Sequence, residues 1–311
     1  MNERELIARL LPALPRNDSV IVAAGDDCAV LDLGAGEYAL FKADAVVEGI
    51  HFTRDTPLEK VGRKALARCL SDIAAMAGQP VAALVTLALP PKFEVTDVDR
   101  LYAGLNQLAT EYGVAIVGGE TTTSPGGVLV SMALLGTVAK DKCVLRSGAK
   151  AGHAVFVSGQ LGGSIHGKHL DFEPRVREAR WLADHFHVSA MIDVSDGLAS
   201  DLRHILQASG VGAELLSTAI PISRETKQSI RAESSAKPPL LAALTDGEDF
   251  ELLFTLPPKS AVALLDGWKK QFPDVPLSCI GKVTAEPGLR LRDEQGLRTL
   301  ALHGYTHFQK P

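Results

Sequence analysis

Aromatic residues and cysteines are both scarce in this sequence. Aromatics make up only 5% of the 311 residues, so we expect a core built from aliphatic side chains. The four cysteines stand singly, without the C-x-x-C spacing of a zinc ribbon or a redox dithiol: Cys28, Cys69, Cys143 and Cys279. Because a chain of this length needs no disulfides to fold, we expect reduced thiols and a cytoplasmic protein.

An excess of positive charge and a long apolar run are also missing. Lys and Arg number 32 and Asp and Glu 37, which gives a formal net charge of −5. We expect no nucleic-acid partner, since binding would need clustered Lys and Arg. We also expect no membrane partner, because no apolar run approaches the ~18 residues of a membrane span. Glu3, Arg4 and Glu5 interrupt the stretch that a signal peptide would need, so residues 1–14 predict a short amphipathic helix.

The sequence does contain apolar segments of two kinds, some with the residue spacing of strands and some with that of helices. The two kinds alternate along the chain. Strands are predicted at 20–24, 28–33, 38–43, 81–89, 114–117, 128–137, 154–158, 190–193, 212–216, 250–256 and 277–283. Helices are predicted at 58–77, 96–112, 175–187, 198–209, 239–244 and 261–272. This alternation predicts an α/β (α+β) protein. At about 150 residues per domain the length predicts two domains. The polar stretch 140–152 is the best linker, so we expect an N-terminal domain at 1–140 and a C-terminal α/β domain at 150–311.

Carboxylates repeatedly follow the predicted elements. They stand after small residues at five places: Asp26 and Asp27, Asp44, Glu120, Asp193 and Asp196, and Asp246 to Asp249. Each alone is typical of a turn or a helix cap. Several carboxylates at strand ends would repel one another in a shared crevice unless cations lay between them. Oxygen ligands without His or Cys favour Mg²⁺. Asp72 joins this set, because it lies in an apolar helical run where a carboxylate needs a partner.

Two segments carry phosphate-related patterns. Residues 162–168 nearly match G-x-x-x-x-G-K-[ST], but His169 stands where the hydroxyl should be and Pro174 breaks the helix that should follow. We therefore do not interpret this segment as a P-loop. The second segment, 145–150, offers the guanidinium of Arg146, which would either clamp a nucleotide phosphate or be a solvated linker charge.

Motifs spread over almost the whole chain resemble those of the thiamine-monophosphate kinases, within the aminoimidazole ribonucleotide synthetase-like ATP enzymes. The matching segments are 25–29, 44–52, 65–76, 118–121, 146–149, 193–202, 247–252 and 304–308. The resemblance implies transfer of the ATP γ-phosphoryl group to thiamine monophosphate, giving thiamine diphosphate. It also implies a two-domain subunit whose N-terminal sheets pair in a homodimer.

The resemblance also implies roles for individual residues. The Mg²⁺ ligands would be Asp27, Asp44, Asp72, Glu120, Asp193 and Asp196. The ATP contacts would be Tyr102, Gly119, Glu120, Arg146 and Ser195. The substrate contacts would be His51, Glu248 and Tyr305. No general base is expected, because the acceptor is a phosphate oxygen that is already anionic, so catalysis reduces to positioning and charge neutralisation.

The chain departs from the family pattern beside Asp44, where many relatives have Ser-Thr-Asp and this sequence has Lys42-Ala43-Asp44. One hypothesis is that the Lys42 ammonium occupies the place of one Mg²⁺, and the alternative is a lysine lying along the surface. Glu120 replaces a more usual Asp. Leu302 falls where some members have an aromatic residue, which leaves Tyr305 as the nearer candidate to contact thiamine.

Two other functions stay open at this point. The first is a related ATP enzyme that activates an amide or a selenide, although Cys28 directly follows Asp27 and does not sit in a loop of its own. A hydrogenase-maturation relative should carry a C-terminal cysteine, and this chain ends in Lys310-Pro311. The second is a catalytically silent nucleotide-binding dimer, suggested by Lys42 and Ala43.

Overall fold

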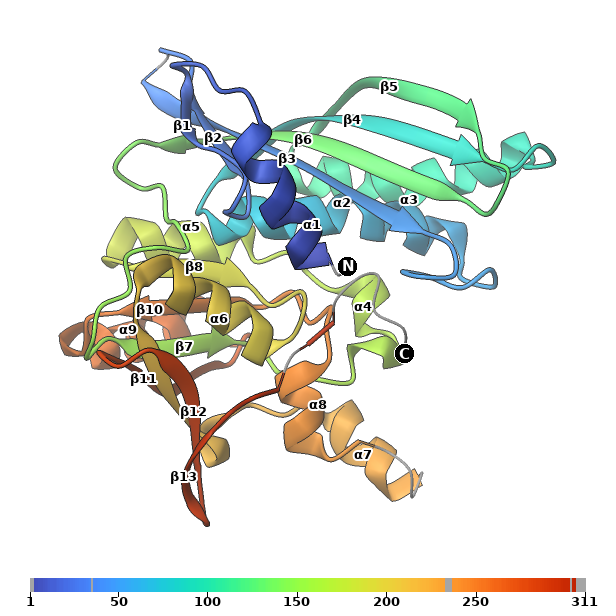
Figure 1. Ribbon diagram of the computed structural model, residues 1–311. Helices are drawn as coiled ribbons and strands as arrows, with labels where there is room; N and C mark the ends of the chain where they lie inside the picture. The colour runs from blue at the N-terminus through green and yellow to red at the C-terminus, as the bar shows by residue number, and fades with distance from the viewer. Residues whose placement is uncertain (1–2, 35, 233–236, 303, 306–311) are drawn as a thin grey trace.

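The computed structural model describes residues 3–34, 36–232, 237–302 and 304–305, and it contains two mixed sheets (Figure 1). The N-terminal half holds a six-stranded sheet in the order β1-β2-β3-β6-β4-β5. Its strands are β1 Val20–Val22, β2 Ala29–Asp32, β3 Glu37–Val47, β4 Gln79–Leu89, β5 Ala115–Thr123 and β6 Leu129–Ala139. Its helices are α1 Glu3–Leu10, α2 Leu58–Ala75 and α3 Val95–Tyr112.

The two faces of this sheet differ in what covers them. Side chains alternate along β3 and β6, so that Leu40 and Leu134 are buried on the face that α2 covers. Phe41 and Leu135, each next to one of these residues, point to the other face, as does Leu84 of β4. Phe41 is 50% exposed, Leu84 45% and Leu135 36%. Within the described chain this second face therefore remains open to solvent.

The C-terminal half holds a seven-stranded sheet in the order β13-β12-β9-β11-β7-β10-β8. Its strands are β7 Ala154–Ser158, β8 Ala190–Asp193, β9 Gly212–Leu216, β10 Leu252–Leu256, β11 Leu277–Thr284, β12 Gly288–Asp293 and β13 Gly296–Thr299. Its helices are α4 Lys168–Asp171, α5 Val176–His185, α6 Leu198–Ser209, α7 Arg224–Ala232, α8 Pro239–Thr245 and α9 Ala261–Gln271. Alternation again divides the core, since Phe156 packs in one buried cluster and Val155 and Val157 in the other.

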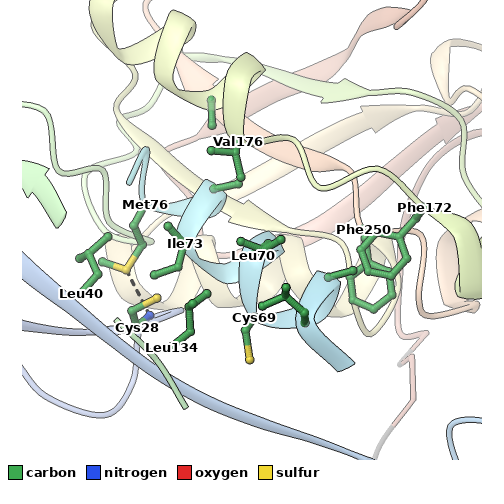
Figure 2. Packing of buried hydrophobic residues seen from close by; sticks show 14 of the residues in the cluster. Cys28, Leu40, Cys69, Leu70, Ile73, Met76, Leu134, Phe172, Val176 and Phe250 are labelled. Carbon is green, nitrogen blue, oxygen red and sulfur yellow. Dashed lines mark hydrogen bonds between the residues drawn. The ribbon is translucent and has the colours of Figure 1, made fainter. Parts of the chain in front are cut away.

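Helix α2 joins the two halves. It contacts β3, β4 and β6 on one side and α4, α5 and β8 on the other. Figure 2 shows this packing, with Leu40 and Leu134 of the sheet on one side of α2 and Val176 of α5 on the other. The helix ends where Ala77 adopts a φ of 58°, and the Gly78 N–H then donates to the Ile73 carbonyl at 2.9 Å. The core is therefore continuous across both halves.

The observed elements correct the predicted ones at several points. Asp44 and Glu120 do not follow strands but lie inside β3 and β5, which run several residues beyond the predicted ends. Helix α7 was not predicted, because its sequence is mostly polar. The hairpin of β12 and β13 was also missed, although Leu289 and Leu291 alternate with arginines as a strand would. In the described part of the chain, no helix combines the length and apolarity that crossing a membrane requires.

Candidate active site

Three carboxylates meet in the interior, between the two halves of the molecule. Asp27 comes from the loop before β2, Asp72 from α2 and Asp193 from the end of β8, and one oxygen of each lies within 4.8 Å of the others. All three residues are at least 93% buried. Segments that are far apart in sequence therefore build one acidic cluster, which we call the carboxylate cluster.

The electrostatics of the carboxylate cluster favour a cation. Burial raises the pKa of Asp72 well above its ordinary value, although Lys42 opposes the shift. Burial and the charge of Asp27 raise the pKa of Asp193 to about 6. The Ser71 hydroxyl donates to Asp193 Oδ2 at 2.5 Å, whereas Asp27 Oδ2 is buried without a hydrogen-bond partner. An all-oxygen donor set with an unsatisfied buried oxygen fits a hard divalent cation such as Mg²⁺.

Cationic side chains of the protein already face these acids. Lys42 Nζ lies 2.9 Å from Asp72 Oδ1. Arg146 Nη2 donates to Asp27 Oδ1 at 2.6 Å, so the segment 140–152 brings this arginine into the site and the reading of a solvated linker charge is wrong. Arg68, which the sequence did not single out, pairs with Asp44 through two hydrogen bonds.

A cleft of about 610 Å³ opens beside the carboxylate cluster. Its walls include five of the predicted site residues, from both halves of the chain: His51, Ser195, Asp196, Glu248 and Tyr305. Ile50, Ile165 and Leu241 add apolar surface. Asp193 and Asp196 lie on the same β8–α6 connection, so the cleft and the carboxylate cluster are neighbours. The cleft therefore offers both charged and apolar surface to a ligand.

The end of the chain contributes one wall of this cleft. The Tyr305 N–H donates to the Asp196 carbonyl at 3.1 Å, and the Gly304 N–H donates to Ser200 Oγ at 2.9 Å. Leu302 instead packs against the C-terminal core, so of the two candidates only Tyr305 lines the cleft. Residues 306–308, which belong to the last matching motif, lie outside the described residues.

A buried lysine that sequence reasoning missed connects the cleft residues. Lys64 on α2 is 0% exposed, and its ammonium donates to the His51 carbonyl at 2.6 Å and to Glu248 Oε2 at 2.8 Å. Arg68 adds a longer contact to Glu248 at 3.4 Å. Glu248 itself has a φ of 64°, which few residues other than glycine adopt. The sequence contains one signal that could have identified Lys64. Lys64, Arg68 and Asp72 are spaced four residues apart, so they lie along one face of α2.

Three predicted residues lie elsewhere in the monomer. Tyr102 is half-buried on α3, and Gly119 and Glu120 lie on the edge strand β5, whose side chains are mostly exposed. Gly119 lies in the same cross-strand row as Asp44, with β6 and β4 between their strands. At ordinary strand spacing the two residues are therefore about 14 Å apart. Glu120 occupies the next row, whose side chains point to the opposite face. A single chain therefore does not bring Glu120 to the carboxylate cluster.

Two further groups lie near the predicted residues. Asp196, Asp201 and His204 form a second set with close ligand atoms, in which neither Asp201 nor His204 was predicted. Lys168 of the P-loop-like segment donates to Glu251 at 2.8 Å and to the Gln160 carbonyl at 3.0 Å. This lysine is therefore paired within the protein, and the segment leads only into the four-residue helix α4. The interpretation that the segment is no P-loop stays a prediction.

Comparison with known proteins agrees with this geometry. Residues 25–138 match AIR synthase related protein, N-terminal domain, and residues 134–294 match AIR synthase related protein, C-terminal domain. Thiamine-monophosphate kinase of Rhodopirellula baltica is 40% identical over 297 residues, covering 92% of this chain and 91% of that protein. The Bacillus subtilis enzyme is 33% identical, with 99% and 100% covered.

Solved structures extend the similarity to three dimensions. "AaThiL complexed with AMPPCP and TMP" superimposes with a TM-score of 0.84 at 31% identity, covering 99% of this chain and 97% of that one. Thiamine monophosphate kinase from Aquifex aeolicus gives 0.76 at 32% identity, with 94% and 98% covered. Escherichia coli HypE, a hydrogenase maturation protein, gives 0.74 at 20% identity, with 97% and 98% covered, and shares the fold alone. The chain therefore belongs to the thiamine-monophosphate kinase family of the AIR synthase related proteins.

Proposed function

We propose that this chain transfers the γ-phosphoryl group of ATP to the phosphate of thiamine monophosphate, giving thiamine diphosphate and ADP. The observation that carries the proposal is the junction of two features on the β8–α6 connection. Asp193 belongs to the buried carboxylate cluster, and Asp196 lines the adjacent cleft with His51 and Glu248. Two phosphates would meet at this junction.

The residues of the chain act mainly by positioning. The acceptor oxygen is anionic near neutral pH, so no side chain has to remove a proton. Arg146 presents a planar guanidinium at the cluster, and it would exchange Asp27 for a phosphate oxygen of ATP. Lys64 holds Glu248 and the His51 loop together, which fixes the acceptor end of the cleft.

Asp27, Asp72 and Asp193 would hold Mg²⁺, with Asp44, Asp196 and Glu120 as further predicted ligands. When bound, the metal would supply positive charge against the phosphate oxygens. The acids are buried and converge on one point, so the chain itself fixes where that charge is placed.

The other end of the cleft suits the organic part of thiamine monophosphate. Ile50, Ile165 and Leu241 offer apolar surface, and Tyr305, which is 49% exposed, offers an aromatic face. Glu248 places a carboxylate near the cationic ring that thiamine carries.

A homodimer is part of the proposal. The open face of the N-terminal sheet carries Phe41, Leu84 and Leu135 in exposed positions, and a second copy of the chain would cover them. Pairing on this side also gives Gly119 and Glu120 on β5 a role at the subunit boundary, where a lone subunit leaves them apart from the carboxylate cluster.

The test is ADP release from Mg-ATP in the presence of thiamine monophosphate, thiamine or aminoimidazole precursors. We expect a strong preference for thiamine monophosphate and the appearance of thiamine diphosphate. Release with another acceptor alone would indicate a related ATP enzyme. Calorimetric binding of Mg-ATP without ADP release from any of these acceptors would instead indicate a silent nucleotide-binding protein.

A further inference from the structure

Asp72 and Asp44, two carboxylates near the proposed site of phosphoryl transfer, form ion pairs with basic side chains of the chain itself. Lys42 on β3 faces Asp72 on α2, with Nζ 2.9 Å from Oδ1. Arg68, one helical turn before Asp72, faces Asp44 on β3. Both pairs link β3 to α2. In the first pair the strand supplies the base and the helix the acid, and in the second pair the strand supplies the acid and the helix the base.

The local structure fixes Lys42 in this position. Residues 42 and 44 lie two apart on β3, so both side chains point to the face that α2 covers, whereas Phe41 points to the open face. The side chains of Lys42 and Asp72 are only 24% and 10% exposed. An ion pair this sheltered is screened weakly by salt, so its charges act on any ligand placed beside it.

Arg68 holds Asp44 more completely. Its Nε donates to Oδ2 at 2.9 Å and its Nη2 to Oδ1 at 3.2 Å, and the Ala45 N–H also donates to Oδ1 at 2.7 Å. Both oxygens of Asp44 are therefore engaged in a bidentate pair. A metal ion that took Asp44 as a ligand would have to compete with this guanidinium.

The formal charges show what these pairs change. Asp27, Asp44, Asp72 and Asp193 are opposed by Lys42, Arg68 and Arg146, so four negative charges meet three positive ones. Without Lys42 and Arg68 the same four acids would face one cation. The difference of two charges equals that of one divalent ion.

We propose that Lys42 and Arg68 are built-in cations of the active site, and that they replace one divalent ion per subunit. The inference rests on the proposed function, because it assigns the two side chains to the site where phosphates would meet. The carboxylate cluster remains available to a divalent ion through Asp27 and Asp193, neither of which contacts Lys42 or Arg68 in the interactions described above.

The test counts metal ions directly. Free Mn²⁺ is measured by electron paramagnetic resonance while it is titrated into the full-length protein saturated with the ATP analogue AMPPCP. We compare the wild type with Lys42→Met and Arg68→Met, which keep an unbranched apolar side chain and remove its charge. We expect each variant to bind more Mn²⁺ than the wild type, and the double variant to bind one additional ion per subunit.

Lys140→Met is the matched control, because Lys140 forms an ion pair with Asp32 on the same sheet but far from the cluster. It should bind the wild-type number of ions. Circular dichroism verifies that each variant is folded, and Lys42→Thr, which suits a strand, serves if Lys42→Met does not fold. An unchanged Mn²⁺ number in the folded Lys42 and Arg68 variants would overturn the proposal, whatever the affinity.

This count is separable from the proposed kinase activity. It needs neither thiamine monophosphate nor turnover, so a protein that releases no ADP would still report whether the two side chains replace an ion. A protein that phosphorylates thiamine monophosphate but shows no change in Mn²⁺ number would keep the proposed function and lose this inference.

Discussion

Asp72 shows how the fold prepares a single side chain for a ligand. A carboxylate that is 7% exposed is costly to ionise, and its pKa is raised by burial even though Lys42 lies 2.9 Å away. The position is stabilised only when more positive charge is near it. We therefore predict that the reaction requires the charge of Asp72.

Asp72→Asn should lower kcat by about 100-fold or more, since a lost charge-assisted contact to a metal or phosphate group is worth several kcal/mol. The protein should stay folded, because the amide keeps the shape of the side chain. ADP release and circular dichroism measure the two effects. Asp32→Asn, which removes an acid paired with Lys140 on the surface, should keep full activity. Wild-type turnover in Asp72→Asn would show that Asp72 has no role in the reaction.

Lys64 carries a second prediction at this scale. Lys64→Met should raise KM for thiamine monophosphate about tenfold more than it changes kcat, because Glu248 and the His51 loop lose their shared ammonium. Leaving those acceptors unpaired should also lower the free energy of unfolding by about 1–3 kcal/mol. Initial-rate kinetics and urea unfolding report the two quantities.

Lys60→Met is the comparison for Lys64→Met, since it lies one turn earlier on α2 and pairs with Asp171 at an exposed site. It should leave both KM and stability nearly unchanged. Equal effects of the two substitutions would mean that Lys64 acts only through the general charge of the helix.

The sequence allowed part of the site to be predicted at residue level. Asp27, Asp72 and Asp193 were chosen as acids beside apolar segments, and the fold brings these three together. Arg68 and Lys64 were not chosen, because a basic residue on an amphipathic helix is ordinarily solvated. Only the tertiary arrangement shows that this face of α2 is covered by β3 together with the C-terminal half.

At the level of elements, most of the predicted strands and helices agree with the observed ones to within a few residues. Whole elements were missed at α7 and at the hairpin of β12 and β13, and strand ends were misplaced where a charged residue was taken as the end of a strand. Asp44 lies inside β3 because α2 supplies Arg68 as its partner, and a strand can continue through a charge that is neutralised. Periodicity within one segment does not contain this information.

Glu251, just before β10, joins four elements through one carboxylate. It accepts hydrogen bonds from Ser158, Lys168 and Arg175, the last through Nε and Nη2 in a bidentate contact. Burial alone would raise its pKa, but Lys168 and Arg175 outweigh burial and lower the pKa of Glu251 to about 2. The ionised group therefore stabilises the fold.

The sign of the pH dependence follows from this lowered pKa. The unfolded chain binds the proton near pH 4.5 and the folded chain near 2, so the stabilisation of about 3 kcal/mol is complete above pH 4.5 and is lost as the pH falls towards 2. Urea unfolding at several pH values should show Glu251→Gln less stable than wild type at pH 7, with the gap closing in acid. Glu286→Gln, at an exposed pair with Arg290, should show no such gap. A gap that persists unchanged at pH 2 would contradict this role.

For the whole molecule, the open face of the N-terminal sheet gives the fourth prediction. Leu84→Glu places a charge among exposed apolar side chains that a second copy would cover, so light scattering should show the particle mass fall from that of a dimer to that of a monomer. Val262→Glu, on the exposed surface of α9, should leave the mass unchanged. A wild-type protein that is monomeric at all concentrations would refute the pairing.

Helix α2 has a consequence for how the molecule comes apart. Each half uses it as core, so neither half keeps a complete interior once the helix is lost. Heat or denaturant should therefore unfold both halves together as one cooperative unit. Calorimetry should record a single unfolding transition, although the molecule has two sheets. Lys64, Arg68 and Asp72 lose their positions in that same event, so no partly unfolded form with one sheet lost keeps an intact active site.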